Sequence, residues 1–319
     1  MKKIAVLTSG GDAPGMNAAI RAVVRSGIYA GCQVFGVTRG FQGLINGDFT
    51  EMTLGSVADI IHRGGTILRT SRCEEFMEER GRRKALEQLE RKGIHDVIGI
   101  GGNGTIRGLY ELSKLGVNTV AIPGSIDNDI PYCDMSIGFD TAVNTVVGAI
   151  NRIRDTATAH ERIFIIEVMG RASGHIALTA GLAGGAESIL IPEVPYDIDQ
   201  VVERLQQGMR RGKLHSIIVV AEGCCGAYPL AEEIRAKTGM DTKVTILGHT
   251  QRGGMPSAMD RNLASRMGKR AVDIVLEGKK NLMTGFQGMK ITDVPLVQVI
   301  EGKKEIDLDI CEIARILSI

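Results

Sequence analysis

Several features are scarce or missing in this chain of 319 residues. It contains no Trp, and aromatic residues make up only 4% of it. Its net charge at pH 7 is +1, from 38 basic and 37 acidic residues, so no overall field attracts nucleic acid or an anionic membrane. No apolar run approaches the ~18 residues that a membrane-spanning helix needs. We therefore expect neither a nucleic-acid partner nor a membrane, and we expect a cytoplasmic protein.

The six cysteines follow no pattern that favours a bridge or a metal. None belongs to a CxxC pair, and none combines with His at the spacing of a zinc site. They are typical of reduced thiols in the cytosol. The N-terminus enters a short apolar run and then a polar glycine loop, which does not fit a signal peptide.

Short apolar runs alternate with stretches of helical period along most of the chain. Strands buried on both faces are predicted at 4–7, 97–100, 119–122, 162–167, 188–191 and 216–221. Helices are predicted between and after them, at 17–29, 84–92, 142–157, 199–210 and 258–277. This alternation is typical of βαβ units, so we predict an α/β protein with mainly parallel sheets.

The length of the chain exceeds the usual size of one domain. We predict two three-layer α/β/α domains with the active site in the cleft between them. The chain leaves the first sheet near Gly138 and returns to it near Thr250. The larger domain then comprises 1–138 plus 251–305, and the smaller one comprises 139–250 plus 306–319.

Four polar or glycine-rich turns follow predicted strands, at 9–12, 101–105, 123–129 and 169–171. In open α/β sheets, ligands bind at the carboxyl ends of the strands. Glycines allow backbone N–H groups to approach a phosphate, and a following helix adds its dipole. A tight turn that binds nothing remains an alternative for each loop alone, since none fits GxxxxGK[ST] or GxGxxG. In the second loop, Thr105 is placed as a helix N-cap.

Two carboxylates stand two residues apart in the third loop, Asp127 and Asp129. One carboxylate suits a proton acceptor and the other an oxygen ligand of Mg²⁺, which is what phosphoryl transfer requires. The alternative is an Asp/Asn turn whose carboxylates are only solvated. Basic residues also accompany strand ends and glycine loops and could bind several phosphates together: Arg72, Arg162, Arg171, Lys243 and Arg252.

Six segments together resemble the bacterial ATP-dependent 6-phosphofructokinases. They are 7–17 (LTSGGDAPGMN), 123–129 (PGSIDND), 138–141 (GFDT), 152–158 (RIRDTAT), 168–171 (VMGR) and 248–254 (GHTQRGG). The similarity extends from the first strand to about residue 278. It implies a glycolytic kinase that transfers the γ-phosphoryl group of ATP to D-fructose 6-phosphate, giving fructose 1,6-bisphosphate, with Mg²⁺ as cofactor. It also implies that the larger domain binds ATP and the smaller one the sugar phosphate.

The resemblance carries catalytic roles to particular residues. Asp127 becomes the base, Arg72 and Arg171 stabilise charge on the transferred group, and Gly11 offers a backbone N–H. Ser125 stands where relatives usually carry Thr, and its hydroxyl can still contact the phosphoryl group. The implied ATP site comprises Gly11, Arg72, Cys73, Gly102, Asn103, Gly104, Thr105 and Gly108. The implied sugar phosphate site comprises Ser125, Asp127, Asp129, Arg162, Met169, Gly170, Arg171, Glu222, Lys243, His249 and Arg252.

The family is typically a homotetramer with shared sites, and the resemblance implies that Arg162 and Lys243 come from a neighbouring subunit. It also implies control by ADP or phosphoenolpyruvate at a second site between subunits. That site would comprise Arg21, Arg25, Arg154, Gly185, Glu187, Arg211 and Lys213.

The resemblance implies two metal ligands, Asn103 and Asp129, and the sequence departs from the family at Asn103. Asn103 stands where relatives have Asp, and its amide has one acceptor oxygen but no negative charge. We expect weaker handling of Mg–ATP, and an alternative function is a weakened paralogue that binds sugar phosphate and effector in a regulatory role. A pyrophosphate-dependent kinase is disfavoured, because Gly104 and Gly124 stand where such relatives have Asp and Lys.

Overall fold

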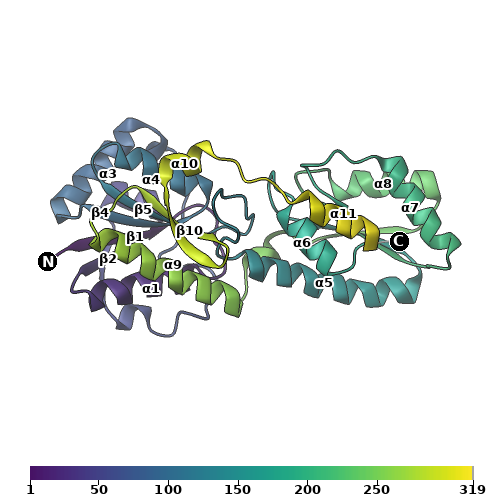
Figure 1. Cartoon of the computed structure of the whole chain (residues 1–319), viewed down its shortest axis with the longest axis horizontal. Helices are drawn as coiled ribbons and strands as arrows, with labels where there is room; N and C mark the ends of the chain where they lie inside the picture. Colours follow the sequence, from purple (N-terminus) through teal and green to yellow (C-terminus); the bar gives the residue numbers. More distant parts are fainter. Residues whose placement is uncertain (318–319) are drawn as a thin grey trace. The chain divides into compact units, whose positions relative to one another are not determined.

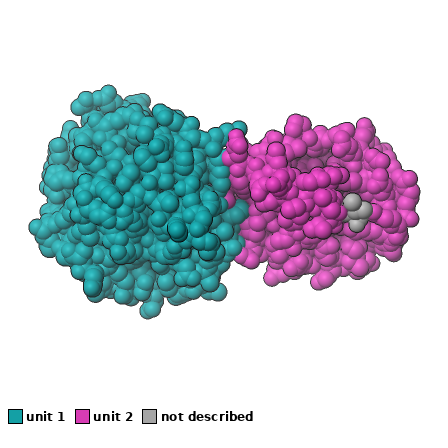
Figure 2. Space-filling view, in the orientation of Figure 1, with its two compact units in different colours: residues 1–125, 129–141, 252–304 teal, residues 126–128, 142–251, 305–319 magenta. Residues whose placement is uncertain are grey.

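The computed structural model describes residues 1–317, so the last two residues of the predicted 306–319 segment lie outside the described residues. The chain forms two compact units (Figure 2). Unit 1 comprises Met1–Ser125, Asp129–Thr141 and Arg252–Lys304. Unit 2 comprises Ile126–Asn128, Ala142–Gln251 and the described residues from Glu305 onwards. The predicted assignment of ATP and sugar phosphate to two domains stays a prediction.

Unit 1 is built on a sheet of seven strands in the order β11-β10-β5-β4-β1-β2-β3. The strands are β1 (Lys3–Thr8), β2 (Gln33–Val37), β3 (Phe49–Met52), β4 (Asp96–Gly101), β5 (Asn118–Pro123), β10 (Leu282–Gln287) and β11 (Lys290–Pro295). The five central strands are parallel, and the edge strands β3 and β11 are antiparallel to their neighbours. Every residue of β4 is buried, as expected for a parallel strand covered on both faces.

Helices cover the two faces of this sheet (Figure 1). They are α1 (Met16–Tyr29), α2 (Gly40–Asn46), α3 (Glu79–Lys92), α4 (Asn103–Ser113), α9 (Ala258–Leu276) and α10 (Leu296–Glu301), with short 3₁₀ turns at Gly55–Val57 and Glu75–Met77. Helices α1 and α9 pack closely together, and Gly268 permits this approach. A Cβ atom on Gly268 would lie 2.6 Å from the Cβ of Ala22 and 2.9 Å from the carbonyl oxygen of Ala19.

Unit 2 has a four-stranded sheet in the order β7-β8-β6-β9, with all neighbouring strands parallel. The strands are β6 (Ile163–Val168), β7 (Ser188–Leu190), β8 (Ser216–Ala221) and β9 (Thr242–Ile246). The helices are α5 (Phe139–His160, which begins in unit 1), α6 (His175–Ala183), α7 (Ile198–Arg210), α8 (Ala227–Thr238) and α11 (Leu308–Leu317). A 3₁₀ turn at Gly248–Arg252 follows β9. Alternate strand residues such as Ile163, Ile165 and Ile218 pack with Val201 and Leu230 of α7 and α8 in one core.

The predicted α/β class with two mainly parallel sheets is confirmed. Each of the six predicted strands is present. The predicted bounds 216–221 agree with β8, and those of the other five strands differ by one residue at one or both ends. Among residues 1–317, no helix is both long and apolar enough to cross a membrane. All six cysteines are free thiols.

Candidate active site

Three glycine-rich loops lie side by side in unit 1, because β5, β4 and β1 are neighbours and parallel. The backbone N–H of Ser9 donates to the carbonyl of Ile100 at 3.1 Å, and that of Gly124 donates to Gly101 at 3.0 Å. Only glycine fits at 101, since a Cβ there would lie 2.5 Å from the carbonyl oxygen of Ser9. The turns after β1, β4 and β5 are therefore held together at the carboxyl edge of the sheet, where ligands of such folds bind.

The prediction that Thr105 caps α4 is wrong. The helix begins at Asn103, and the residue before it, Gly102, is the N-cap, with extended backbone angles. The amide of Thr105 already donates to the carbonyl of Gly102 at 2.9 Å, so Thr105 lies inside the first turn. Its hydroxyl instead donates to the carbonyl of Ser9 at 3.0 Å and joins the β1 and β4 loops.

The first turn of α4 leaves space beside its backbone. A Cβ added to Gly104 would have no neighbour within 4 Å, and both Asn103 and Gly104 are exposed. The Asn103 amide makes only a long contact, from Nδ2 to the carbonyl oxygen of Asp129 at 3.5 Å. The N-terminal end of α4 thus lies beside open space, and the N-terminus of a helix favours an anion.

Gly11 and Arg252, predicted for two different ligands, lie together in unit 1. A Cβ on Gly11 would lie 2.3 Å from the Arg252 guanidinium, which also donates to the carbonyl of Asp12 at 3.2 Å. Arg72 is exposed, and its side chain makes no hydrogen bond or ion pair with the described part of the chain. This guanidinium is therefore available to a ligand.

Two residues of the predicted ATP site, Cys73 and Gly108, pack against other residues of unit 1. Burial raises the pKa of the Cys73 thiol. A Cβ on Gly108 would lie 2.6 Å from the Phe41 ring, which stacks on Phe76 with their centroids 4.1 Å apart. Gly108 is thus needed for helix packing, whatever its contact with nucleotide.

In unit 2, the turn after β6 is held by one carboxylate. Oε1 of Glu222 accepts hydrogen bonds from the backbone N–H groups of Gly170 at 3.2 Å and Arg171 at 2.8 Å. Arg171 has a left-handed backbone with φ 55°, and a Cβ on Gly170 would lie 2.2 Å from the carbonyl oxygen of Ser173. Glu222 therefore determines where the Arg171 side chain begins, which sequence patterns do not reveal.

Asp127 lies next to this turn within the same unit. The hydroxyl of Ser173 donates to the backbone carbonyl of Asp127 at 3.1 Å, and Asp127 is only 6% exposed. Gln251, which is fully buried, accepts from the N–H of Met169 at 3.2 Å and donates to the carbonyl of Gly248 at 3.0 Å. The predicted base is thus connected to the predicted sugar-binding turn through Ser173, and Gln251 connects that turn to Gly248.

Arg162 and Lys243 lie at the other end of the unit 2 sheet, at the amino ends of β6 and β9. Register pairs Ile163 with Thr242 and Phe164 with Lys243. The Arg162 Nε lies 2.6 Å from one oxygen of Asp241, and the Lys243 Nζ lies 2.9 Å from the other. The six residues of β6 span about 20 Å at ~3.3 Å per residue. One sugar monophosphate cannot contact both this pair and the turn at 169–171 of the same chain.

Four of the predicted effector residues are brought together in unit 2. An Nη of Arg154 donates to the carbonyl of Gly185 at 3.0 Å. The nearly buried Glu187 carboxylate pairs with Lys213 and accepts from the backbone N–H of Ile217. Arg211 is the C-cap that follows α7 in the same unit, whereas Arg21 and Arg25 lie on α1 in unit 1.

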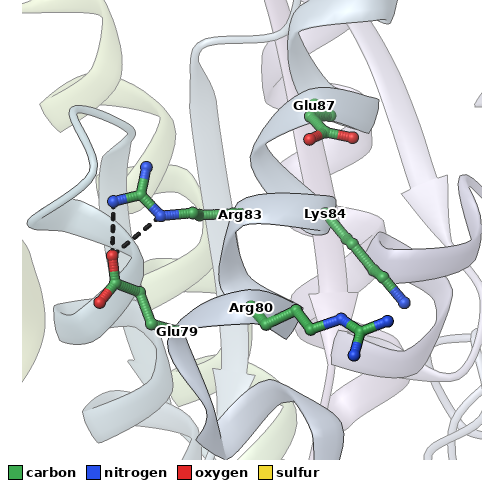
Figure 3. A pocket seen from close by; sticks show the side chains of 5 residues that line it. All are labelled: Glu79, Arg80, Arg83, Lys84 and Glu87. Atoms are coloured by element: carbon green, nitrogen blue, oxygen red, sulfur yellow. Dashed lines mark hydrogen bonds and ion pairs between the residues drawn. The ribbon is translucent and has the colours of Figure 1, made fainter.

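A surface hollow on α3 contains none of the predicted site residues. It is lined by Glu79, Arg80, Arg83, Lys84 and Glu87 (Figure 3). The Arg83 guanidinium is paired with Glu79, as expected for charges four residues apart on an exposed helix. Lys84 is likewise paired with Glu75, so we assign this hollow to a solvated helix face.

Three residues that sequence reasoning left unassigned take part in the site. Gln251 stands inside the 248–254 motif, so the motif itself was the signal that identified its region. Ser173 and Asp241 had no such signal, because a hydroxyl and an exposed carboxylate gain their roles only from their partners in space.

The phosphofructokinase family matches residues 3–275 of the chain. The ATP-dependent 6-phosphofructokinase of Alkaliphilus metalliredigens is 59% identical over the full length of both chains, and that of Natranaerobius thermophilus is 56% identical over the same extent. Phosphofructokinase from Saccharomyces cerevisiae superposes with a TM-score of 0.90 at 38% identity, over 94% of this chain and 45% of that one.

The fold and these relatives together define an enzyme of the kinase class. The chain belongs to the phosphofructokinase family.

Proposed function

We propose that the chain catalyses the ATP-dependent phosphorylation of D-fructose 6-phosphate to fructose 1,6-bisphosphate in glycolysis, in the cytoplasm. The observation that carries this proposal is the connection of Asp127, through Ser173, to the turn that carries Arg171. A buried carboxyl residue and a guanidinium held on adjacent elements suit a reaction that moves a proton and stabilises phosphoryl charge.

The chemical step moves one phosphoryl group. The oxygen of the sugar 1-hydroxyl forms a bond to the γ-phosphorus, the bond from that phosphorus to the bridging oxygen breaks, and ADP leaves. The hydroxyl proton passes to the Asp127 carboxylate. Arg171 and the unpaired Arg72 stabilise charge on the group in transfer, while the hydroxyl of Ser125 and the N–H of Gly11 orient it.

Oxygen donors in unit 1 fit a magnesium ion that arrives with the nucleotide. The half-buried Asp129 and the amide oxygen of Asn103 would hold it. Among the described residues, no three His, Cys, Asp or Glu side chains cluster as a metal site. Mg²⁺ commonly uses only one or two carboxylates together with substrate phosphates and waters, so this donor set is sufficient. When bound, the ion neutralises charge on the phosphates.

We assign ATP to residues of unit 1 and the sugar phosphate mainly to residues of unit 2. The open space beside Gly104 favours ATP over pyrophosphate, since no side chain occupies the room that the nucleotide needs. The sugar contacts Met169, Gly170 and Glu222, with His249 and Arg252 also contributing to the phosphate site. ADP or phosphoenolpyruvate would act as effector at Arg154, Gly185, Glu187, Arg211 and Lys213, with Arg21 and Arg25 from another subunit of a homotetramer.

The test is ADP formation from fructose 6-phosphate and ATP across a magnesium titration. Wild type, Asn103→Asp and Asp127→Ser are compared. We expect the wild type to turn over and Asp127→Ser to be at least a thousandfold slower, because the proton acceptor is lost. We expect Asn103→Asp to reach its maximal rate at a lower Mg²⁺ concentration than the wild type, because a full carboxylate charge is restored.

A binding-only regulatory paralogue is the alternative that this assay addresses. Identity of 59% to an ATP-dependent 6-phosphofructokinase does not favour it. Negligible wild-type turnover that Asn103→Asp restores would establish the alternative and refute the kinase.

Arg162 and Lys243 are too far from the 169–171 turn to bind the same sugar phosphate within one chain, so we propose that two subunits share each site. Mixing two variant chains tests this sharing. Asp127→Ser and Lys243→Ala chains are inactive or weak alone. After they are unfolded and refolded together, about a quarter of the sites combine intact Asp127 with intact Lys243 if subunits associate at random. Mixtures that never exceed the sum of the separate activities would contradict sharing.

A further inference from the structure

The exposed cluster at the amino ends of β6 and β9 contains one anion between two cations. Arg162 precedes β6, and Asp241 and Lys243 lie at the start of β9. The backbone N–H of Ile163 donates to the carbonyl of Asp241 at 3.1 Å, which fixes the Asp241 main chain against β6. The sheet therefore fixes the backbone from which the Asp241 side chain extends.

Each oxygen of Asp241 serves a different cation. Oδ2 lies 2.6 Å from Nε of Arg162, and Oδ1 lies 2.9 Å from Nζ of Lys243. The hydrogen bond from Lys243, reinforced by the Arg162 charge, lowers the pKa of the Asp241 carboxyl. The carboxylate thus remains charged while it holds both cations.

The N–H donors of Arg162 and Lys243 that Asp241 does not use are the kind that binds a phosphate. Because Asp241 contacts Nε of Arg162, both terminal nitrogens of the guanidinium remain for an anion, and the ammonium of Lys243 keeps two further N–H donors. Two cations that contact the same carboxylate would repel each other if that carboxylate were absent. The cluster of one anion and two cations retains a charge of +1, which still attracts a dianion.

We propose that Asp241 is a positioning residue for the phosphate of the sugar substrate, holding Arg162 and Lys243 as a preformed pair of phosphate donors. The inference rests on the proposed function, and it adds a carboxylate to a site otherwise described by its cations. The carboxylate itself contacts neither the sugar nor the reacting atoms.

Steady-state kinetics of Asp241→Asn tests the inference. We expect the KM for fructose 6-phosphate to rise about threefold to tenfold, since exposed ion pairs contribute modestly, while kcat and the KM for ATP stay unchanged. Asp241→Glu should recover most of the loss, because it restores the charge. Asp199→Asn removes another exposed carboxylate of unit 2, the partner of Lys237 at 2.8 Å, and should change neither KM.

The outcomes separate this inference from the proposed function. If Lys243→Ala raises the KM for fructose 6-phosphate and Asp241→Asn leaves it unchanged, the cations act without Asp241 and the inference is wrong. A KM that falls in Asp241→Asn would show that the carboxylate competes with phosphate, which also overturns it. Absence of wild-type turnover with fructose 6-phosphate would refute the proposed function itself.

Discussion

Asp260 is a buried carboxylate whose removal should destabilise unit 1. It is fully buried in the first turn of α9, and its side chain accepts three hydrogen bonds. The donors are the backbone N–H of Gly138 at 2.8 Å, the N–H of Thr141 at 2.9 Å and the Thr141 hydroxyl at 2.5 Å. This carboxylate therefore joins α9 to the start of α5, two segments far apart in the chain.

The size of the effect follows from these contacts. Hydrogen bonds to a charged group contribute about 1.5–3 kcal/mol each, and a buried donor that loses its partner costs about 1–3 kcal/mol. Asp260→Asn keeps one acceptor oxygen but points an NH₂ group toward at least one donor. We expect it to lower the free energy of unfolding by about 2–4 kcal/mol, and Asp260→Ala by about 3–5 kcal/mol.

Urea unfolding, followed by circular dichroism at one fixed protein concentration, measures this difference, since association changes apparent stability. Asp273→Asn is the matched control on the same helix. Its carboxylate pairs with the exposed Lys269, so the change should stay within about 0.5 kcal/mol. If Asp260→Asn is no more destabilising than Asp273→Asn, the three hydrogen bonds do not contribute as argued.

Two other substitutions probe the candidate site. Gly104→Asp should leave the urea midpoint unchanged, because a Cβ at this position has no neighbour within 4 Å. It should raise the KM for ATP at least tenfold, since it places a negative charge beside the phosphates. An unchanged KM for ATP would show that Gly104 does not belong to the nucleotide site. Gln251→Leu leaves the N–H of Met169 without its buried acceptor, so we expect about 1–3 kcal/mol of destabilisation and a raised KM for fructose 6-phosphate. A variant with wild-type KM would show that Gln251 serves stability alone.

The strands β1, β4, β5, β6, β7 and β8 could be predicted because they are largely buried and consist of continuous apolar runs. The sequence does not predict β2, β3, β9, β10 or β11. β3 has two exposed residues among its four, and β11 is only partly buried, so neither shows such a run. The order of strands depends on pairings between distant segments, as where β10 joins β5, and no local pattern encodes them. The misplaced cap at Thr105 has the same origin, since its hydroxyl partner Ser9 lies 96 residues away.

The candidate site shows a second limit, which concerns the ends of strands. Arg162 and Met169 are separated by one six-residue strand, so they are close in the chain, yet β6 places them about 20 Å apart. Asp127 and Ser173 are 46 residues apart and share a hydrogen bond. Motifs identify residues that serve a phosphate or a sugar, but only strand direction tells which of them one subunit can present to the same ligand. Because Arg162 and Lys243 share the amino edge and Asp127 is joined to the carboxyl edge, a single copy of the chain presents the two parts of the predicted sugar phosphate site at opposite edges of the unit 2 sheet.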